Sequence, residues 1–195
     1  LRTTPFALAA ASLALVTAAA APTAQAQPVT YTVDPTHTYV TFEATHFGTS
    51  TNRGRFDRKE GSITLDRTAR SGRADISIDM ASISTGLAAF DGHLRSKDFF
   101  NAAEFATARF VGDRFTFDGA KVSSVAGNLT MLGKTMPVTL RATQFNCFDH
   151  PMLKREVCGG DFETTIQRSQ WGMGFGLPGI PDSIRLLVQV EGIRQ

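Results

Sequence analysis

One stretch decides the fold: Arg73-Ala74-Asp75-Ile76-Ser77-Ile78-Asp79-Met80, in which polar and apolar side chains alternate. A period of two is typical of a β-strand with one face in water and the other in a core. The same alternation returns in residues 40–44, 125–131, 138–142 and 184–190. Since no window carries a long apolar stripe of period 3.6, the sequence predicts an all-β fold.

Short turns join the predicted strands. Asp118-Gly119 and Gly133-Lys134 lie between alternating runs, and glycine at such a turn favours a tight β-hairpin. Hairpins make neighbouring strands antiparallel, and a sheet of this size closes as a sandwich or as an up-and-down barrel. The periodicity does not choose between these two.

Two segments interrupt the strand pattern. Residues 86–101 contain scattered apolar side chains and the pair Phe99-Phe100, which predicts a short helix or turn lying across the sheet. Residues 169–183 are rich in Gly and Pro and predict a long loop with apolar contacts. Such a loop either guards an entrance or packs under the rim of a barrel, and packing is the simpler interpretation.

The amino-terminal segment is typical of a secretory signal peptide. In residues 1–26 a charge-poor apolar run precedes the small residues of Ala24-Gln25-Ala26. Cleavage after Ala26 would leave residues 27–195 as one domain. The apolar run is short for a membrane span, and no later segment is continuously apolar, so we expect no transmembrane segment in the mature chain.

The two cysteines of the chain are Cys147 and Cys158. In the oxidising compartment that an exported chain enters, we expect them to form a disulfide, with two buried free thiols as the alternative. A zinc site is disfavoured because no second Cys or His pair stands at a suitable spacing. The net charge is +2, or +1 without Arg2, and no basic stripe emerges, which disfavours nucleic-acid binding.

Polar, ionisable and aromatic residues crowd together in residues 91–101, which makes this segment the main candidate site. Three histidines, His37, His46 and His93, could converge there as a metal site or as a general base with a nearby aspartate. The simpler interpretation is that each histidine caps a turn or donates to a carbonyl. No nucleophile elbow is present, and the glycines of residues 174–179 lack the strand and helix of a dinucleotide site.

The chain contains fifteen phenylalanines against one tryptophan and two tyrosines. Any single phenylalanine is best explained as core. As a set they indicate a very apolar interior, and the small residues Ala44, Ala74, Gly127 and Ala142 on the apolar faces would leave space in it. An eight-stranded barrel either fills with side chains or holds one slender ligand, and we favour a cavity.

A set of short motifs is found at residues 34–42, His46, and residues 54–56, 82–86, 91–100, 127–133 and 137–140. Together these motifs resemble the YceI-like family of exported lipid-binding or polyisoprenoid-binding proteins. The resemblance implies a lipocalin-like antiparallel β-barrel with a short helical segment, whose elongated cavity sequesters an isoprenoid chain or a similar long amphiphile in the periplasm. The family usually has Ser-Asp-Phe-Gly where this chain has Ser169-Gln170-Trp171-Gly172.

The expected function is therefore sequestration of a lipid, with no catalysis and no cofactor. Apolar strand faces would remove a hydrocarbon chain from water, while polar side chains near the mouth hold the head group and Phe99-Phe100 covers the opening. The expected ligand-binding residues are His37, Phe42, His46, Phe56, Asp91, His93, Phe99 and Phe100.

Two other functions stay open. An enzyme acting on a lipid or quinone would use His93 and Asp91 as an acid-base pair, although no nucleophile or strong metal-binding spacing accompanies them. A stress-related interaction module would have a filled core. A lipid is the expected small-molecule partner, and a homodimer is also left open.

Overall fold

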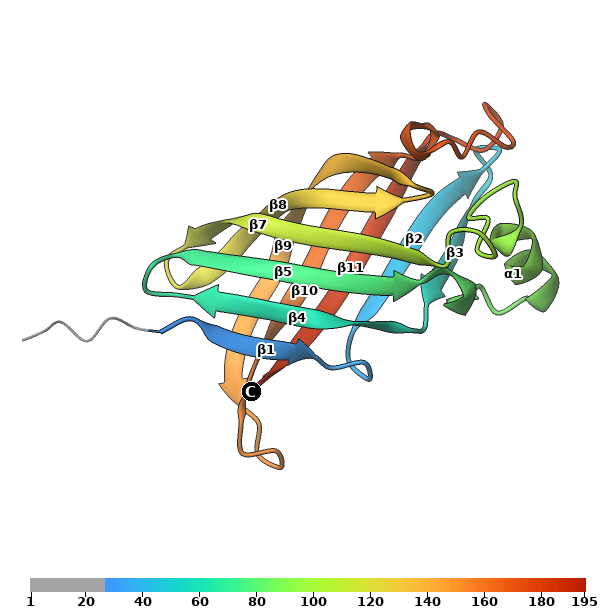
Figure 1. The fold of residues 1–195 in the computed structure, drawn as a ribbon. Helices are drawn as coiled ribbons and strands as arrows, with labels where there is room; N and C mark the ends of the chain where they lie inside the picture. Colours follow the sequence, from blue (N-terminus) through green and yellow to red (C-terminus); the bar gives the residue numbers. More distant parts are fainter. Residues whose placement is uncertain (1–26) are drawn as a thin grey trace, which may run out of the picture.

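The computed structural model describes residues 27–195, which form one closed antiparallel β-barrel with a short α-helix (Figure 1). The predicted all-β barrel with a short helical segment is confirmed. The signal peptide expected at residues 1–26 lies outside the described residues.

The described sheet contains eleven strand segments: β1 (Val29–Val33), β2 (Tyr39–His46), β3 (Ser50–Phe56), β4 (Lys59–Asp66), β5 (Ser71–Asp79), β6 (Ile83–Ser84), β7 (Thr107–Asp118), β8 (Lys121–Met131), β9 (Lys134–Asp149), β10 (Glu156–Gln167) and β11 (Ser183–Arg194). The helical elements are α1 (Ala88–Arg95) and the two 3-10 helices η1 (Met80–Ser82) and η2 (Arg168–Trp171). All strand pairs are antiparallel.

The eleven segments make eight barrel strands because three of those strands are interrupted. β1 and β2 pair with consecutive parts of the same edge of β11, so residues 34–38 are a bend within one barrel strand. On the side away from β11, β1 pairs with β4 and β2 pairs with β3. In the next barrel strand, β5 pairs with β4 and β6 pairs with β3. Pro35 lies in the bend, where its missing N–H costs no ladder hydrogen bond.

The barrel wall is interrupted at one end, which we call the mouth. β6 pairs with β3 and with no other described strand, whereas β7 joins β5 only from Thr107 onward. Residues 85–106, which include α1, cover the resulting gap (Figure 1). Leu94 of α1 is buried, and the Phe100 ring packs edge-on against Phe56 of β3 with 5.4 Å between centroids.

Gly127 has a different role from the one expected from sequence. It lies directly opposite Gly112 where β7 and β8 change register, and a Cβ at this position would collide with the carbonyl oxygen of Val111. This glycine therefore permits close approach of two strands and does not create space for a ligand. Ala74 and Ala44 do line interior cavities.

The predicted disulfide is confirmed. Cys147 of β9 lies directly opposite Cys158 of β10, with 4.1 Å between their Cα atoms. Beyond this bond the hairpin continues to a tip at residues 150–155, which projects from the barrel on the side away from α1 (Figure 1). No helix in residues 27–195 has both the length and the apolar character needed to cross a bilayer.

Candidate ligand-binding site

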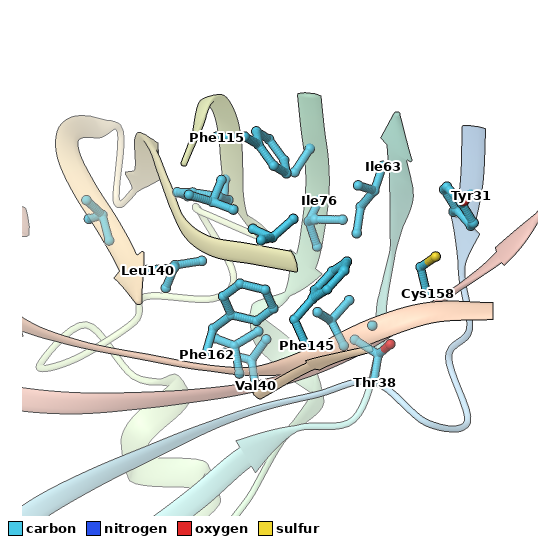
Figure 2. Close-up of a pocket in the computed structure, with 18 of the residues that line it drawn as sticks. Tyr31, Thr38, Val40, Ile63, Ile76, Phe115, Leu140, Phe145, Cys158 and Phe162 are labelled. Atoms are coloured by element: carbon cyan, nitrogen blue, oxygen red, sulfur yellow. The ribbon is translucent and has the colours of Figure 1, made fainter. Parts of the chain in front are cut away.

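Two adjoining cavities occupy the barrel. The inner cavity has a volume of about 110 Å³ and lies between the strand faces, as Figure 2 shows. The outer cavity has a volume of about 540 Å³ and lies at the mouth, beneath α1 and the loop between η2 and β11. Both cavities are lined by Val40, Ile78, Leu129 and Leu186. These four shared residues give the two cavities a common apolar wall.

Phenylalanine side chains narrow the inner cavity without filling it. Phe145 and Phe162 project from one side of the barrel, opposite Phe115 and the isoleucines Ile63 and Ile76 (Figure 2). The remaining space is small and apolar, which suits a hydrocarbon chain better than a bulky head group.

The polar side chains of the inner cavity already have partners. The Tyr31 hydroxyl donates to Glu156 Oε1 over 2.6 Å, and burial together with this bond raises the pKa of Tyr31 to about 12. The hydroxyl of Thr38 donates to the Glu191 carbonyl and accepts from the Glu191 N–H. Since both hydroxyls are satisfied, the inner cavity presents an apolar wall.

Six of the eight expected ligand-binding residues come together around the outer cavity. They lie on β2, on β3 and on the segment that contains α1. These six are Phe42, His46, Phe56, His93, Phe99 and Phe100. The sequence segments that supply them meet because β2 and β3 extend past the gap in the wall and residues 85–106 fold across it.

The mouth is closed by a strap, which we define as residues 172–182 between η2 and β11. Its Phe175 ring contacts the rings of His93 and Phe99, with centroids 5.2 and 5.4 Å away. His93 and Phe99 also meet each other edge-on at 5.0 Å. On the far side, the Phe47 N–H donates to the Gly179 carbonyl over 3.1 Å. The strap thus spans the mouth from the β2–β3 turn to α1.

A buried arginine holds the strap in place. The Arg168 guanidinium lines the outer cavity and donates to four backbone carbonyls of the strap, at Met173, Phe175, Ile180 and Pro181, over 2.8 to 3.0 Å. It forms no ion pair with any described residue, and burial lowers the pKa of Arg168. The carbonyl dipoles take the place of water around this charge.

The other two expected ligand-binding residues, His37 and Asp91, line neither cavity. His37 lies in the bend before β2, whereas His46 ends the same strand, and the seven steps from Tyr39 to His46 span about 23 Å. His37 is exposed and bonds Asp34 Oδ2 over 2.7 Å, and this bond raises the pKa of His37. Asp91 Oδ1 accepts instead from the N–H and the hydroxyl of Thr85, which fixes the start of α1.

His37 does belong to one set of potential metal ligands. In residues 27–195, one ligand atom each from Asp34, His37 and Glu191 lie within 4.8 Å of one another. Burial opposes ionisation of Asp34, but the hydrogen bonds from His37 and Thr36 outweigh it and lower the pKa of Asp34 to about 2. The ionised carboxylate is thus already engaged by hydrogen bonds that hold the bend.

Comparison with known proteins agrees with the barrel fold. A family model described as a YceI-like domain matches residues 31–192. The chain belongs to the YceI-like family. A UPF0312 protein of Pseudomonas aeruginosa strain LESB58 is 33% identical over 174 residues, which cover 88% of this chain and 90% of that protein.

Solved structures share the YceI-like fold of this chain. The crystal structure of Burkholderia cenocepacia BcnA matches with a TM-score of 0.67 and 23% identity, over 82% of this chain and 98% of BcnA. A polyisoprenoid binding domain from Saccharophagus degradans, implicated in plant cell wall breakdown, matches with a TM-score of 0.60 and 16% identity, over 85% of this chain and 98% of that domain. At these identities the matches establish the fold.

Several residues at the mouth of this YceI-like barrel were missed from sequence. They are Phe47, Phe90, Arg168, Met173, Phe175 and Ile180. Arg168 could have been found from sequence. It continues the alternation of the inward-facing residues Phe162 and Ile166 of β10, and an arginine is unusual at an inward-facing position of an apolar barrel. The strap residues carry no comparable periodic signal, since the loop follows no strand or helix repeat.

Proposed function

We propose that this protein binds a long-chain isoprenoid or a similar amphiphilic lipid inside the barrel, without catalysis, and that it does so in the periplasm. The observation that carries the proposal is the pair of adjoining cavities with a common apolar wall. A barrel whose interior were completely packed would have no place for such a ligand.

The energetics favour a hydrocarbon chain. Each methylene group that moves from water into the cavity contributes about 0.8 kcal/mol before the cost of ordering the chain is subtracted. The slender inner cavity would take the chain, and the wider outer cavity would take the bulkier end of the molecule. His46, His93, Asn52 and Arg168 bring polar atoms to the outer cavity, where they would orient a head group.

The comparisons support the same chemical class. The Saccharophagus degradans domain of similar fold is named for binding a polyisoprenoid. We extend this ligand class to the present chain because it shares the barrel and contains apolar cavities of its own. Extraction of the protein would identify the exact ligand.

The direct test is extraction of the protein purified from the periplasm of its own organism. Organic extraction and mass spectrometry should recover a long-chain lipid in near-stoichiometric amount. A periplasmic protein of unrelated fold, purified from the same cells, controls for carry-over. Repeated recovery of no lipid above that control would refute the proposal.

The enzyme alternative gains little from the geometry. Its acid-base pair is not formed, because Asp91 bonds Thr85 while His93 Nε2 lies 3.1 Å from Asp98 Oδ2. A binding protein needs neither group as a catalyst, and binding accounts for the size and character of both cavities.

A further inference from the structure

Large apolar side chains are exposed around the mouth. Phe47 is 66% exposed, Leu87 62%, Phe175 46% and Leu177 41%. They come from three separate segments, namely the β2–β3 turn, the start of α1 and the strap, and all three segments lie at the same end of the barrel (Figure 1). Exposed apolar side chains that gather in one place mark an interaction surface.

The three segments that carry these side chains are joined to one another, and we call the surface that they form the mouth surface. The Phe47 backbone is hydrogen-bonded to Gly179 of the strap, and Phe175 of the strap packs against His93 of α1. Phe47 and Phe175 also line the outer cavity. The mouth surface therefore surrounds the opening of the cavity and is continuous with its apolar wall.

The charge pattern of this surface is uneven. Residues 44–52, 83–90 and 169–181 contain no Asp, Glu, Lys or Arg. At the edge of the surface, Lys97 and Lys134 form no ion pair with any residue in the described part of the chain, and the Lys134 ammonium lies beside Gly172.

The neighbouring carboxylates all have partners. Asp91 accepts from Thr85, Asp98 lies beside His93, and Asp182 accepts from Ser169. These carboxylates keep their charge but are engaged by donors within the protein, so the two lysine ammonium groups are the ones free to face lipid phosphates at the edge of an apolar centre. That arrangement complements an interface with negative head groups outside and hydrocarbon beneath.

We propose that the mouth surface docks onto an anionic lipid bilayer, with Phe47, Leu87, Phe175 and Leu177 inserted among the head groups and the two lysines facing lipid phosphates. This inference rests on the proposed function, because a bound lipid has to leave or enter a membrane. With the mouth seated on the bilayer, a hydrocarbon chain passes between membrane and cavity without crossing water. Aromatic and leucine side chains are the usual residues at such interfaces.

The test compares two double variants of the whole protein. Leu87→Ser with Leu177→Ser removes exposed apolar groups from the mouth surface, and neither residue lines a cavity. Leu87 is the N-cap residue of α1, a position where serine is favoured, so this change should not harm the helix. Met152→Ser with Leu153→Ser is the matched control, because it removes two exposed apolar side chains from the β9–β10 tip.

The probe is sedimentation with vesicles of equimolar phosphatidylglycerol and phosphatidylcholine. Mass spectrometry should first verify that all preparations begin at the same residue, so that residues 1–26 contribute equally. Wild type and the tip variant should bind these vesicles, whereas the mouth variant should bind at least about tenfold more weakly. Replacing phosphatidylglycerol by phosphatidylcholine should also weaken the wild-type protein, as should Lys97→Gln with Lys134→Gln.

Three results would overturn the proposal: no vesicle binding by the wild-type protein, equal binding by the mouth variant, or a loss confined to the tip variant. A surface for a protein partner would give the first of these. Binding of a water-soluble fluorescent fatty acid, measured without vesicles, separates this proposal from the proposed function. The mouth variant should bind that probe like wild type, and failure of all forms to bind it would count against lipid binding while leaving the docking result valid.

Discussion

Arg168 shows how one residue organises the site. Its guanidinium is nearly excluded from water, and its charge is stabilised by backbone carbonyl dipoles of the strap rather than by a carboxylate. Removing the guanidinium would leave four strap carbonyls without this donor, and buried acceptors without donors are costly. The closed position of the strap therefore depends on a residue that lies outside the strap itself.

We expect Arg168→Met to lower the free energy of unfolding by about 3 kcal/mol, since methionine keeps part of the packing but none of the hydrogen bonds. Urea denaturation measures this loss, and limited proteolysis should show faster cleavage within residues 172–182. Arg155→Met, at an exposed arginine with no ion pair among the described residues, should change neither. An unchanged urea midpoint in Arg168→Met would contradict the assigned role.

Asp34 makes the bend between β1 and β2 sensitive to pH. Its pKa of about 2 lies below the ordinary value of 3.8, so its stabilising effect is present above pH 3.8 and is lost as the pH falls towards 2. The pKa of His37 is raised above 6.5. The stabilisation that protonated His37 contributes is therefore complete below pH 6.5 and is lost as the pH rises through the raised pKa. Asp34 and His37 together therefore stabilise the bend most between pH 3.8 and pH 6.5.

We accordingly expect Asp34→Asn to cost at most about 2 kcal/mol near pH 5 and much less near pH 2, where the Asp34 carboxylate is already partly protonated. The cost should also be smaller at pH 8 than at pH 5. Urea unfolding of both proteins at the three pH values gives the difference directly. A difference that stays the same at every pH would show that the carboxylate charge has no part in holding the bend.

At the scale of elements, the β9–β10 hairpin is joined to the barrel by pairing that ends before its tip. β8 pairs with β9 only as far as Arg141, and the remaining residues of β9 pair with β10 alone. The Cys147–Cys158 bond joins this part of β9 to β10, and Cys158 also pairs with Gly192 of β11. Beyond Arg141, β9 has a neighbouring strand on one side only, so the disulfide has a structural role in holding this edge to β10.

Replacing both cysteines by serine should lower the free energy of unfolding by about 3 kcal/mol, the chain-entropy value for a sequence separation of 11. Thermal melts with and without a reductant measure the effect. The reductant should lower the Tm of the wild-type protein towards that of the double variant and leave the variant unchanged. Equal melting temperatures for wild type and variant would show that strand pairing alone holds this part of the β9–β10 hairpin.

At the scale of the whole molecule, the two cavities act together only if the path between them is open. Leu186 of β11 lines both cavities, whereas its neighbour Leu187 faces the outside of the barrel. A large side chain at residue 186 would block the path, and the same side chain at residue 187 would not.

Leu186→Trp should therefore weaken binding of a long-chain fluorescent lipid at least about tenfold and leave binding of a short-chain analogue nearly unchanged. Leu187→Trp is the matched control and should bind both probes like wild type. Circular dichroism of the two variants shows whether each keeps the barrel. Equal loss for the short and long probes would show that the inner cavity does not receive the chain.

The sequence alone predicted strands at residues 40–44, 73–80, 125–131, 138–142 and 184–190 with the inward face of each, and it favoured the Cys147–Cys158 disulfide. These features depend on local period and on composition, so Ile76, Ile78 and the Cys147–Cys158 pair could be assigned without a structure. The resemblance to the YceI-like family added the closed barrel, which period two by itself did not choose over a sandwich.

Only the tertiary structure decided which residues meet at the mouth. It placed His46 beside the cavity and His37 on the outside, although both belong to one interrupted barrel strand. It also brought Phe175 onto His93 from a loop 82 residues later in the chain, as their numbers show (175 − 93). Such contacts follow from how the sheet closes and where its wall is interrupted, and a local pattern carries no information about either.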